Sequence, residues 1–563
     1  MFMSTQNISK ASSPQFDAAD GISATGWEEA EHPQIREAFM RNSSKQVSAL
    51  RENAPPRIRL MVLLAAVTVF LVAASARLFV LYYITGTDQS SMGWFVDAFH
   101  HWQIGYLSKE IGFQQGFLRL WDFKGMEYFW GLLHPLALAG LFGLTGSIDI
   151  MVPRILSLVS GSVSVVALYF LVKRYFNVHA AIAVALLVSF NPVIALADIS
   201  GMQEPSGIAL LLVGLLFWPK RPIVAGIFLG SAGMVRAEFW VFGLGLAIAA
   251  LWVVREGYGK WGLLLGWLIP TLLYMKYLAH YTGNAIYPVY WYFVGDAAGA
   301  WMADRQLLPI ETSAVWASRI ILPIVAIAAV WVLRKRPRYS LLILLGIGEL
   351  IFLCLVFGFS AFVRGFTPRL LFDRIFLLAY ISIALFAAII LLGYRTKKIP
   401  ITVSVAIGWL GVIGLAVGSQ ILWQPILGYY QPYRSSWDRQ FQAADRIADY
   451  YNGGVISMPE YKPAFTYHMA RNRSIPVQNM ESQMYDPFSY LGGDPFENWP
   501  ATKATLRSWF SDNDIRLLVV HTEKENYREM LNRVPDWFEY QESVLLDTYD
   551  IYRVRIENSE NTN

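Results

Sequence analysis

Residues 60–84 read LMVLLAAVTVFLVAASARLFVLYYI, a stretch in which Arg77 is the only charged side chain. A bilayer core about 30 Å thick is crossed by about 20 apolar residues of α-helix, so this stretch predicts a membrane span. The sequence therefore predicts a mostly α-helical membrane protein with about eleven transmembrane helices. The further apolar runs are 155–172, 179–199, 205–219, 223–237, 239–254, 261–281, 314–333, 340–362, 371–393 and 400–422.

The composition indicates that lipid surrounds much of the chain. Of its 563 residues, 55% are hydrophobic and 16% are charged, whereas a soluble globular protein has about 25% charged residues. The single cysteine, Cys354, excludes a disulfide framework within one chain. No basic stripe with interleaved aromatic residues appears in the polar parts, so nucleic acid is not expected as a partner. Residues 1–56 are polar without an early apolar core, which favours a disordered cytoplasmic arm over a signal peptide.

Clusters of Lys and Arg between the apolar runs determine the expected orientation, because such clusters mark cytoplasmic loops. All of them fall on the cytoplasmic side only if a further apolar run, residues 128–146, lies on the membrane surface or re-enters the membrane without crossing it. Residues 85–154 then form a first outer loop with juxtamembrane helices. The clusters are Lys173–Arg174, Lys220–Arg221, Arg255 with Lys260, residues 334–338, and Arg395 with Lys397–Lys398.

The tail has a different character from the membrane part, residues 57–423. Residues 424–563 hold 14 Lys and Arg against 20 Asp and Glu, a net charge of −6, although the whole chain carries +4. Helical and strand-like patterns alternate there, which predicts a small extracytoplasmic α/β domain. The expected helices are 436–451, 502–510 and 525–534, and the expected strands are 455–458, 517–520 and a closing hairpin through Tyr549 and Tyr552.

Two acidic residues at the expected outer face are candidates for catalysis. Asp97 lies in the aromatic stretch WFVDAFHHW, where partial desolvation would raise the pKa of its carboxyl and make it a better base. On a helix it would share a face with His101 and lie beside His100. Glu204 precedes a proline that opens the next apolar run. The alternatives are a solvated acid on an interfacial helix and an ordinary first-turn acid favoured by the helix dipole.

Basic residues at the same face are candidates for binding substrate. Arg236 and Glu238 share a tight turn between apolar runs, where they either line a cavity or pair with each other. Arg77 could extend to the interface or pair with a carboxylate. Three arginines on a face that should be poor in them indicate a phosphate site, with Lys276 adding to the same field; the alternative is headgroup anchoring. They are Arg364, Arg369 and Arg374.

The order of these features resembles the GT-C fold glycosyltransferases that use polyprenyl-phosphate sugars. The likeness is nearest to the bacterial branch related to protein O-mannosyltransferases and lipid A aminoarabinose transferase. It covers residues 57–423 and, more loosely, the tail. It is carried by Asp97, by WGLLHPL at 130–136, by PRILS at 153–157 with YFLVKRYF at 169–176, by SGMQEP at 200–205 and by VRAE at 235–238.

The resemblance implies an inverting transfer of one sugar from a polyprenyl-phosphate donor to a glycan, lipid or protein acceptor outside the cytoplasm. Asp97 would be the base and Glu204 would assist it. The substrate would be bound by His100, His101, Arg236, Glu238, Lys276, Arg364, Arg369 and Arg374. Many members carry paired acids in the first outer loop, but Asp97 stands beside two histidines, so no metal ligand is assigned and a divalent ion is left open.

Other functions are compatible with parts of the pattern. A transporter or flippase of lipid-linked glycans would show similar halves and polar residues near the middle of the membrane, whereas here the polar residues gather at one face. A glycan polymerase or ligase that uses diphosphate-linked glycans is not excluded. A non-catalytic scaffold would not need the acids at the outer face. The motif WWDYG, typical of oligosaccharyltransferases, is absent.

Overall fold

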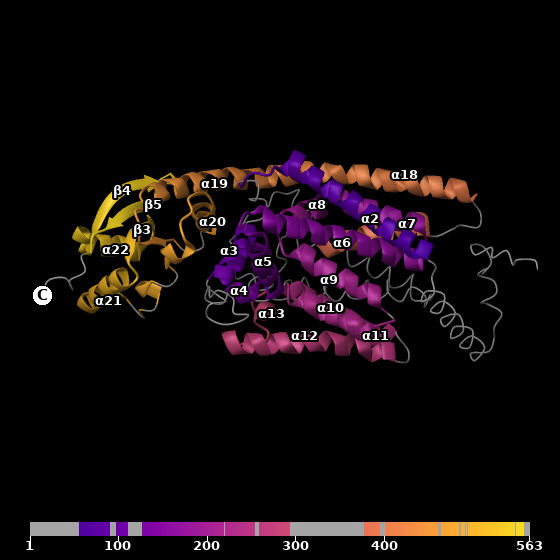
Figure 1. Ribbon diagram of the computed structural model, residues 1–563, viewed down its shortest axis with the longest axis horizontal. Coiled ribbons are helices and arrows are strands. Elements are labelled where there is room, and N and C mark those ends of the chain that lie inside the picture. Colours follow the sequence, from indigo (N-terminus) through magenta and orange to yellow (C-terminus); the bar gives the residue numbers. More distant parts are fainter. Residues whose placement is uncertain are drawn as a thin grey trace, which may run out of the picture. The chain divides into compact units, whose positions relative to one another are not determined.

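The structure, a computed structural model, describes residues 56–89, 97–110, 126–218, 220–253, 258–292, 377–393, 400–459, 463–483, 486–489, 491, 494–546 and 548–556. The chain divides into two compact units, Met1–Val67 and Thr68–Asn563. The predicted disordered arm, the apolar runs 314–333 and 340–362, and the three clustered arginines lie outside the described residues. Figure 1 shows the described helices and strands.

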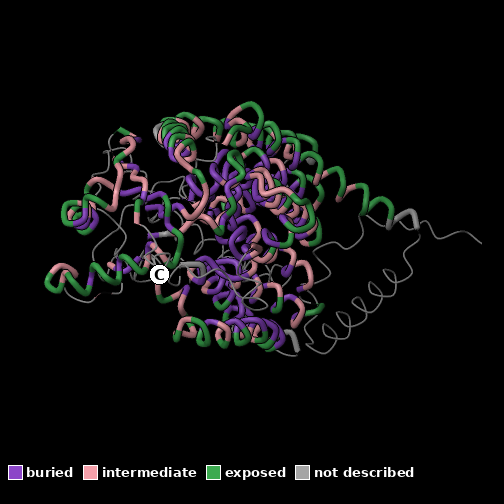
Figure 2. The backbone as a smooth tube through the Cα atoms, turned by 60° about the vertical axis from the view of Figure 1, so that its left-hand side comes forward, coloured by how far each residue is buried: buried purple, intermediate pink, exposed green. Residues whose placement is uncertain are grey.

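Within the described residues, four helices are long and apolar enough to cross a membrane. They lie in Leu60–Thr85, Met151–Tyr175, Trp261–Thr282 and Thr402–Asp449. The corresponding elements are α2 (Pro56–Phe79) with its π-helical continuation η2 (Val80–Thr85), α6 (Met151–Tyr175), α12 (Tyr258–Thr282) and α18 (Ile401–Ser419). Large hydrophobic side chains are exposed on these helices, as is typical of helices that face lipid in an integral membrane protein. Leu71, Tyr83 and Leu410, for example, are 57%, 79% and 69% exposed. Figure 2 shows buried residues gathered in the interior and exposed ones on the outer helices.

The remaining predicted spans in the described residues are shorter helices, so the count of about eleven is not reproduced there. Proline and glycine limit the length of α10, which begins at Pro222 and ends at Gly233. A helix of 14 residues is about 21 Å long, which is less than the bilayer core. These helices are α9 (Glu204–Phe217), α10 (Pro222–Gly233), α11 (Ala237–Val253) and α17 (Leu377–Ala388) with η9 (Ile389–Gly393).

The predicted run 179–199 is two helices and not one, which corrects the sequence analysis. Helices α7 (Val178–Ser189) and α8 (Pro192–Ile199) meet at an angle of 64°. Asn191 starts the second helix, because its side-chain oxygen accepts hydrogen bonds from the backbone N–H groups of Val193 and Ile194 at 3.0 and 3.1 Å. An asparagine cap followed by proline at the first helical position is a strong start signal. If the pair is one bent span, the described residues hold five.

The described residues of the first loop form the helices α3 (Asp97–Glu110), α4 (Met126–Phe129) and α5 (Leu133–Thr145). The predicted surface segment 128–146 is therefore interrupted at residues 130–132. Its longer part, α5, has 13 residues and extends about 20 Å. That this segment lies on the membrane surface without crossing it stays a prediction.

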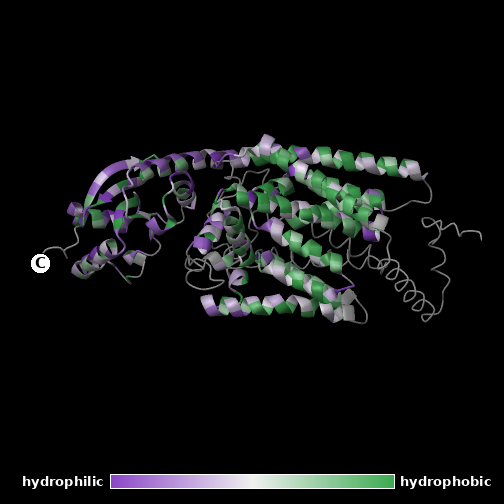
Figure 3. Cartoon of the chain, in the orientation of Figure 1, coloured by the Kyte–Doolittle hydropathy of each residue, from purple (hydrophilic) through white to green (hydrophobic). Residues whose placement is uncertain are grey.

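The helix before the C-terminal domain is longer than predicted. Helix α18, the short η10 (Gln420–Leu422) and α19 (Trp423–Asp449) follow one another without a gap. The predicted boundary between residues 423 and 424 therefore falls inside a continuous helical stretch, and the helix expected from 436 starts at Trp423. Figure 3 shows that this stretch changes from hydrophobic in α18 to hydrophilic along α19. A change of composition marks the change of solvent without ending the helix.

The C-terminal sheet has the strand order β2-β1-β3-β5-β4. Its parallel part joins β1 to both β2 and β3, and its antiparallel part joins β5 to β3 and β4. Alternate residues of β3 enter different cores, with Leu517 and Val519 on one face and Leu518 and Val520 on the other, as the period of a strand requires. The elements are β1 (Val455–Met458), α20 (Pro463–Asn472), β2 (Met480–Ser482), α21 (Trp499–Asp512), β3 (Ile515–His521), α22 (Glu525–Arg533), β4 (Phe538–Val544) and β5 (Tyr549–Val554).

Candidate functional site

Two hydrogen bonds show which ends of α6 and α9 lie side by side. Ser157, near the start of α6, donates to the Met202 carbonyl, just before α9, at 2.6 Å. At the other end of these helices, Arg174 donates to the Trp218 carbonyl at 3.0 Å. The basic clusters at 173–174 and 220–221 therefore lie toward one end of the helices, as the sequence predicts. We call the opposite end, where α6, α9 and α11 begin, the site end.

A buried ion cluster occupies the site end. Arg236, in the turn before α11, forms an ion pair of 2.7 Å between its Nη1 and Glu204 Oε1, and its Nε donates to Glu238 Oε1. Glu204, Arg236 and Glu238 are 3%, 6% and 6% exposed. In the described part of the chain, Glu238 Oε2 has no hydrogen-bond partner. One guanidinium thus contacts two carboxylates, and Glu238 Oε2 remains available as an acceptor among the described residues.

The segment between α4 and α5 packs directly on this cluster. With its amide nitrogen turned toward them, Gln203 donates to the carbonyls of Trp130 and Val235 at 2.6 and 3.1 Å. The Leu133 N–H donates to the Met234 carbonyl at 3.1 Å. Gly131 lies between these contacts with a φ of +89°. The segment is therefore fixed by a backbone hydrogen bond to the turn before Arg236 and by the side-chain amide of Gln203, the neighbour of Glu204.

Replacing Gly131 with alanine should detach this segment from the turn. A Cβ at Gly131 would lie 2.5 Å from the carbonyl oxygens of both Met234 and Val235, in addition to the cost of a positive φ. We expect a loss of about 1–3 kcal/mol of stability, the usual cost of a strained backbone position, measured as a lower midpoint of thermal unfolding in detergent. Gly140→Ala is the matched control, because a Cβ there meets nothing within 4 Å. Equal midpoints for the two variants would contradict this role of Gly131.

Aromatic and histidine side chains connect α3 to the same segment. The rings of His100 and His101 lie 5.5 and 5.4 Å from Trp130, and His101 also lies 5.4 Å from His134. His134 is 1% exposed, and neither ring nitrogen has a hydrogen-bond partner among the described residues. Burial lowers the pKa of His134 to about 3, so this imidazole is neutral at physiological pH. The group supplies stacking surface and neutral hydrogen-bonding atoms.

Asp97 is the first residue of α3 and is half-buried. It shares a helix face with His101, as predicted, because residues four apart are neighbours on a helix. His101 contacts Trp130, and the Trp130 carbonyl lies in hydrogen-bond reach of Gln203, the neighbour of Glu204. The structure thus places the rings of His100 and His101 against Trp130, and Asp97 lies on the same helix.

A second buried ion pair lies nearby, and sequence reasoning missed one of its members. Arg77 Nε and Nη2 both donate to Asp198 Oδ2, at 2.8 and 2.5 Å. Gly161 makes room for the pair, since a Cβ there would lie 2.2 Å from the Asp198 carboxyl carbon. The available signal was an acid within the apolar run 179–199, because an ionisable residue at membrane depth needs a partner. Arg154 is likewise buried, and its Nε donates to the Ile199 carbonyl at 3.0 Å.

Of the other predicted binding residues, the structure describes Lys276 alone. Lys276 is exposed on α12. Arg364, Arg369 and Arg374 lie outside the described residues, so their role stays a prediction. Among the residues that the structure describes, no group of three or more His, Cys, Asp or Glu side chains is arranged to hold a metal ion. The aromatic residues 287–292 form the short helix α13 (Tyr287–Tyr292).

Comparisons with known proteins give similarity in structure alone. No family model and no curated protein matches the chain. ArnT from Cupriavidus metallidurans in the apo state has a TM-score of 0.49 and 12% identity, over 88% of this chain and 97% of that chain; bound to undecaprenyl phosphate, the values are 0.48, 11%, 89% and 98%. The Archaeoglobus fulgidus oligosaccharyltransferase, tethered with an acceptor peptide, has 0.48, 11%, 88% and 74%.

Proposed function

We propose that the chain is an integral-membrane glycosyltransferase that moves one sugar from a polyprenyl-phosphate donor to an acceptor at the extracytoplasmic face. The observation that supports it best is the buried cluster of Glu204, Arg236 and Glu238 at the site end, joined through Trp130 to the helix that begins with Asp97. Buried charges at membrane depth are costly and are typical of functional sites. Here they lie where helices begin, which favours chemistry at the membrane surface over transport through its middle.

The proposed reaction is a displacement at the anomeric carbon with inversion. The acceptor oxygen forms a bond to this carbon while the bond from the carbon to the phosphate oxygen breaks. Asp97 takes the proton of the acceptor hydroxyl, and the polyprenyl phosphate leaves with the bonding electrons. General base catalysis of this kind contributes about 10²–10⁴-fold to the rate.

The ion cluster suits the sugar better than the phosphate. Arg236 is already shared between Glu204 and Glu238, so it has little charge left for an anionic group. Carboxylate oxygens accept hydrogen bonds from hydroxyl groups, and Glu238 has an oxygen available for one. We therefore assign the donor phosphate to Arg364, Arg369 and Arg374, because guanidinium groups bind phosphate with two parallel hydrogen bonds. His100 is half-buried and offers a ring on which a sugar can stack, while His101 and Trp130 are buried and hold that ring in place.

Consumption of a lipid-linked donor tests this function. Purified full-length protein in lipid nanodiscs should convert at least one synthetic polyprenyl-phosphate sugar to polyprenyl phosphate, detected by mass spectrometry. A matched set of polyprenyl-diphosphate sugars should not be consumed. Consumption of the diphosphate donors alone would indicate a polymerase or ligase. Transfer of intact donor between leaflets, without release of polyprenyl phosphate, would indicate a flippase.

A further inference from the structure

Helix α3 is held from two opposite sides. Successive residues of a helix are about 100° apart, so Phe99 and Trp102 lie on a different face from Asp97 and His101. The face with His101 meets Trp130 and His134. The other face meets the C-terminal domain, as described below. A helix of this length is marginal by itself, so its position depends on what packs against it.

The C-terminal domain contributes an aromatic contact to α3. Phe99 is fully buried, with its ring centroid 5.4 Å from Tyr467 of α20 and 4.9 Å from Trp437 of α19. Trp102, also fully buried, meets the ring of Tyr467 edge to face at 4.9 Å. Tyr467 therefore packs on both residues of this face. Aromatic pairs at these distances stabilise a contact beyond what their burial alone provides.

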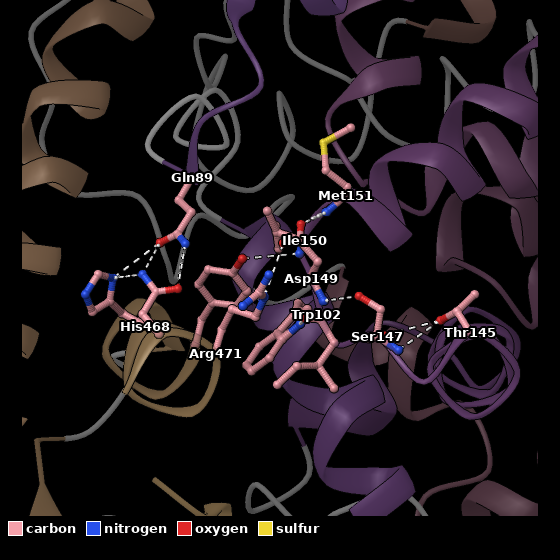
Figure 4. A network of polar contacts seen from close by, with 12 residues as sticks. Gln89, Trp102, Thr145, Ser147, Asp149, Ile150, Met151, His468 and Arg471 are labelled. Carbon is pink, nitrogen blue, oxygen red and sulfur yellow. Dashed lines mark hydrogen bonds and ion pairs between the residues drawn. The ribbon is translucent and has the colours of Figure 1, made fainter. Parts of the chain in front are cut away.

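Polar contacts fix the same helix α20 to the segment before α6. The Tyr467 hydroxyl accepts a hydrogen bond from the Ile150 N–H at 3.3 Å, and Arg471 pairs with Asp149 at 3.3 Å. Trp102 of α3 joins the same segment, since its indole N–H donates to the Ile148 carbonyl at 2.7 Å. Figure 4 shows Trp102, Ile150 and Arg471 close together, with Gln89 beside His468 of the same helix α20. Tyr467 thus touches α3 and the start of α6 at once.

We propose that α20 is a positioning element of the transfer site and that it acts on Asp97 through Tyr467 and α3. The proposal rests on the proposed function. Tyr467 packs against the face of α3 that is opposite the site. We therefore assign it a positioning role, without contact to the substrate. Its removal would free one side of α3 and allow Asp97 to shift, and a misplacement of about 1 Å at a reacting group can cost about 10²-fold in rate.

Tyr467→Ala in the full-length protein tests the proposal. We expect turnover to fall about 10–100-fold with the KM for donor changed less than about threefold, because the phosphate contacts lie elsewhere. Hydrogen–deuterium exchange of residues 97–110 should rise, while β1 and β3 stay protected. Tyr467→Phe keeps the ring and should retain most of the turnover.

Tyr527→Ala is the matched control. Tyr527 is another buried tyrosine of the same domain. It belongs to α22 and enters the core on that side of the sheet, and its hydroxyl donates to Asp486 at 2.7 Å. It should leave exchange in α3 unchanged. The proposal is overturned if Tyr467→Ala leaves exchange in α3 unchanged, if Tyr527→Ala raises it equally, or if α3 loosens without any loss of turnover. If the unmodified protein consumes no donor, the proposed function fails, and exchange in α3 alone still decides whether α20 holds this helix.

Discussion

Arg236→Ala is expected to destabilise the folded protein by about 3–5 kcal/mol, the cost of removing one partner from a buried ion pair. Glu204 and Glu238 would then face each other in a buried site without the guanidinium that now contacts both. Each carboxylate would lose a charged hydrogen bond, and the two would repel each other. The measurement is the midpoint of thermal unfolding in detergent, together with the fraction of protein that elutes as a single folded species.

Two companion variants separate charge from shape at this position. Arg236→Lys keeps the charge but lacks the planar fork, so it should recover part of the lost stability. A triple variant, Arg236→Met with Glu204→Gln and Glu238→Gln, removes all three charges and should be more stable than Arg236→Ala, because neutral groups do not need a buried counter-charge. It should still be inactive in donor consumption. A wild-type unfolding midpoint for Arg236→Ala would show that the cluster is not the buried, mutually dependent group described above.

The ion cluster shows how far sequence reasoning could go. Arg236 and Glu238 are two residues apart, so their pairing was one of the two interpretations of the turn, and it is present. Glu204 lies 32 positions from Arg236, and its participation depends on how α9 packs against the turn before α11. Arg77 and Asp198 are 121 positions apart. Local pattern can flag a buried charge, but only the fold supplies its partner.

The helices show the same limit. Apolar composition located the membrane segments, because the bilayer requires it. It did not locate their ends. The break before α8 was signalled by Asn191–Pro192, a cap and first-position pair that a count of apolar residues ignores. At the junction of α18 and α19 the error is the reverse: the composition changes sharply and suggests a helix end, but the helical backbone continues.

Sequence patterns predict most helices and strands of the C-terminal domain but not α20 and β2. The strands at 455–458 and 517–520 and the final hairpin are present, as are the helices α21 and α22. Helix α20 was missed because its sequence PAFTYHMARN mixes aromatic and polar residues on several faces. Its buried residues face two directions: Phe465 enters the core of the domain, and Tyr467 meets α3. Strand β2 has three residues, too few for an alternating pattern to be visible.

Asp97→Asn is expected to lower turnover by about 10²–10⁴-fold while leaving donor binding near its wild-type level. Asparagine has the size of aspartate but cannot accept the proton of the acceptor hydroxyl, so the loss should be that of a general base. The phosphate contacts that we assign to arginines do not involve this side chain. The measurement is turnover and donor affinity side by side, with two rival acids tested in the same assay. These are Glu204→Gln and Asp122→Asn, because Asp122 is the other acid of the first outer loop that stands between aromatic residues, Trp121 and Phe123.

If Asp97 only stabilises the start of α3, a different result is expected. As the first residue of α3, an aspartate gains about 0.3–1 kcal/mol from the helix dipole, and asparagine is about as good at starting a helix. If Asp97 only begins the helix, Asp97→Asn should keep nearly full activity and stability. A large fall in turnover with an unchanged unfolding midpoint therefore separates the base from the cap. Full activity of Asp97→Asn beside an inactive Asp122→Asn or Glu204→Gln would move the base to that residue, and full activity of all three would remove the glycosyltransferase mechanism.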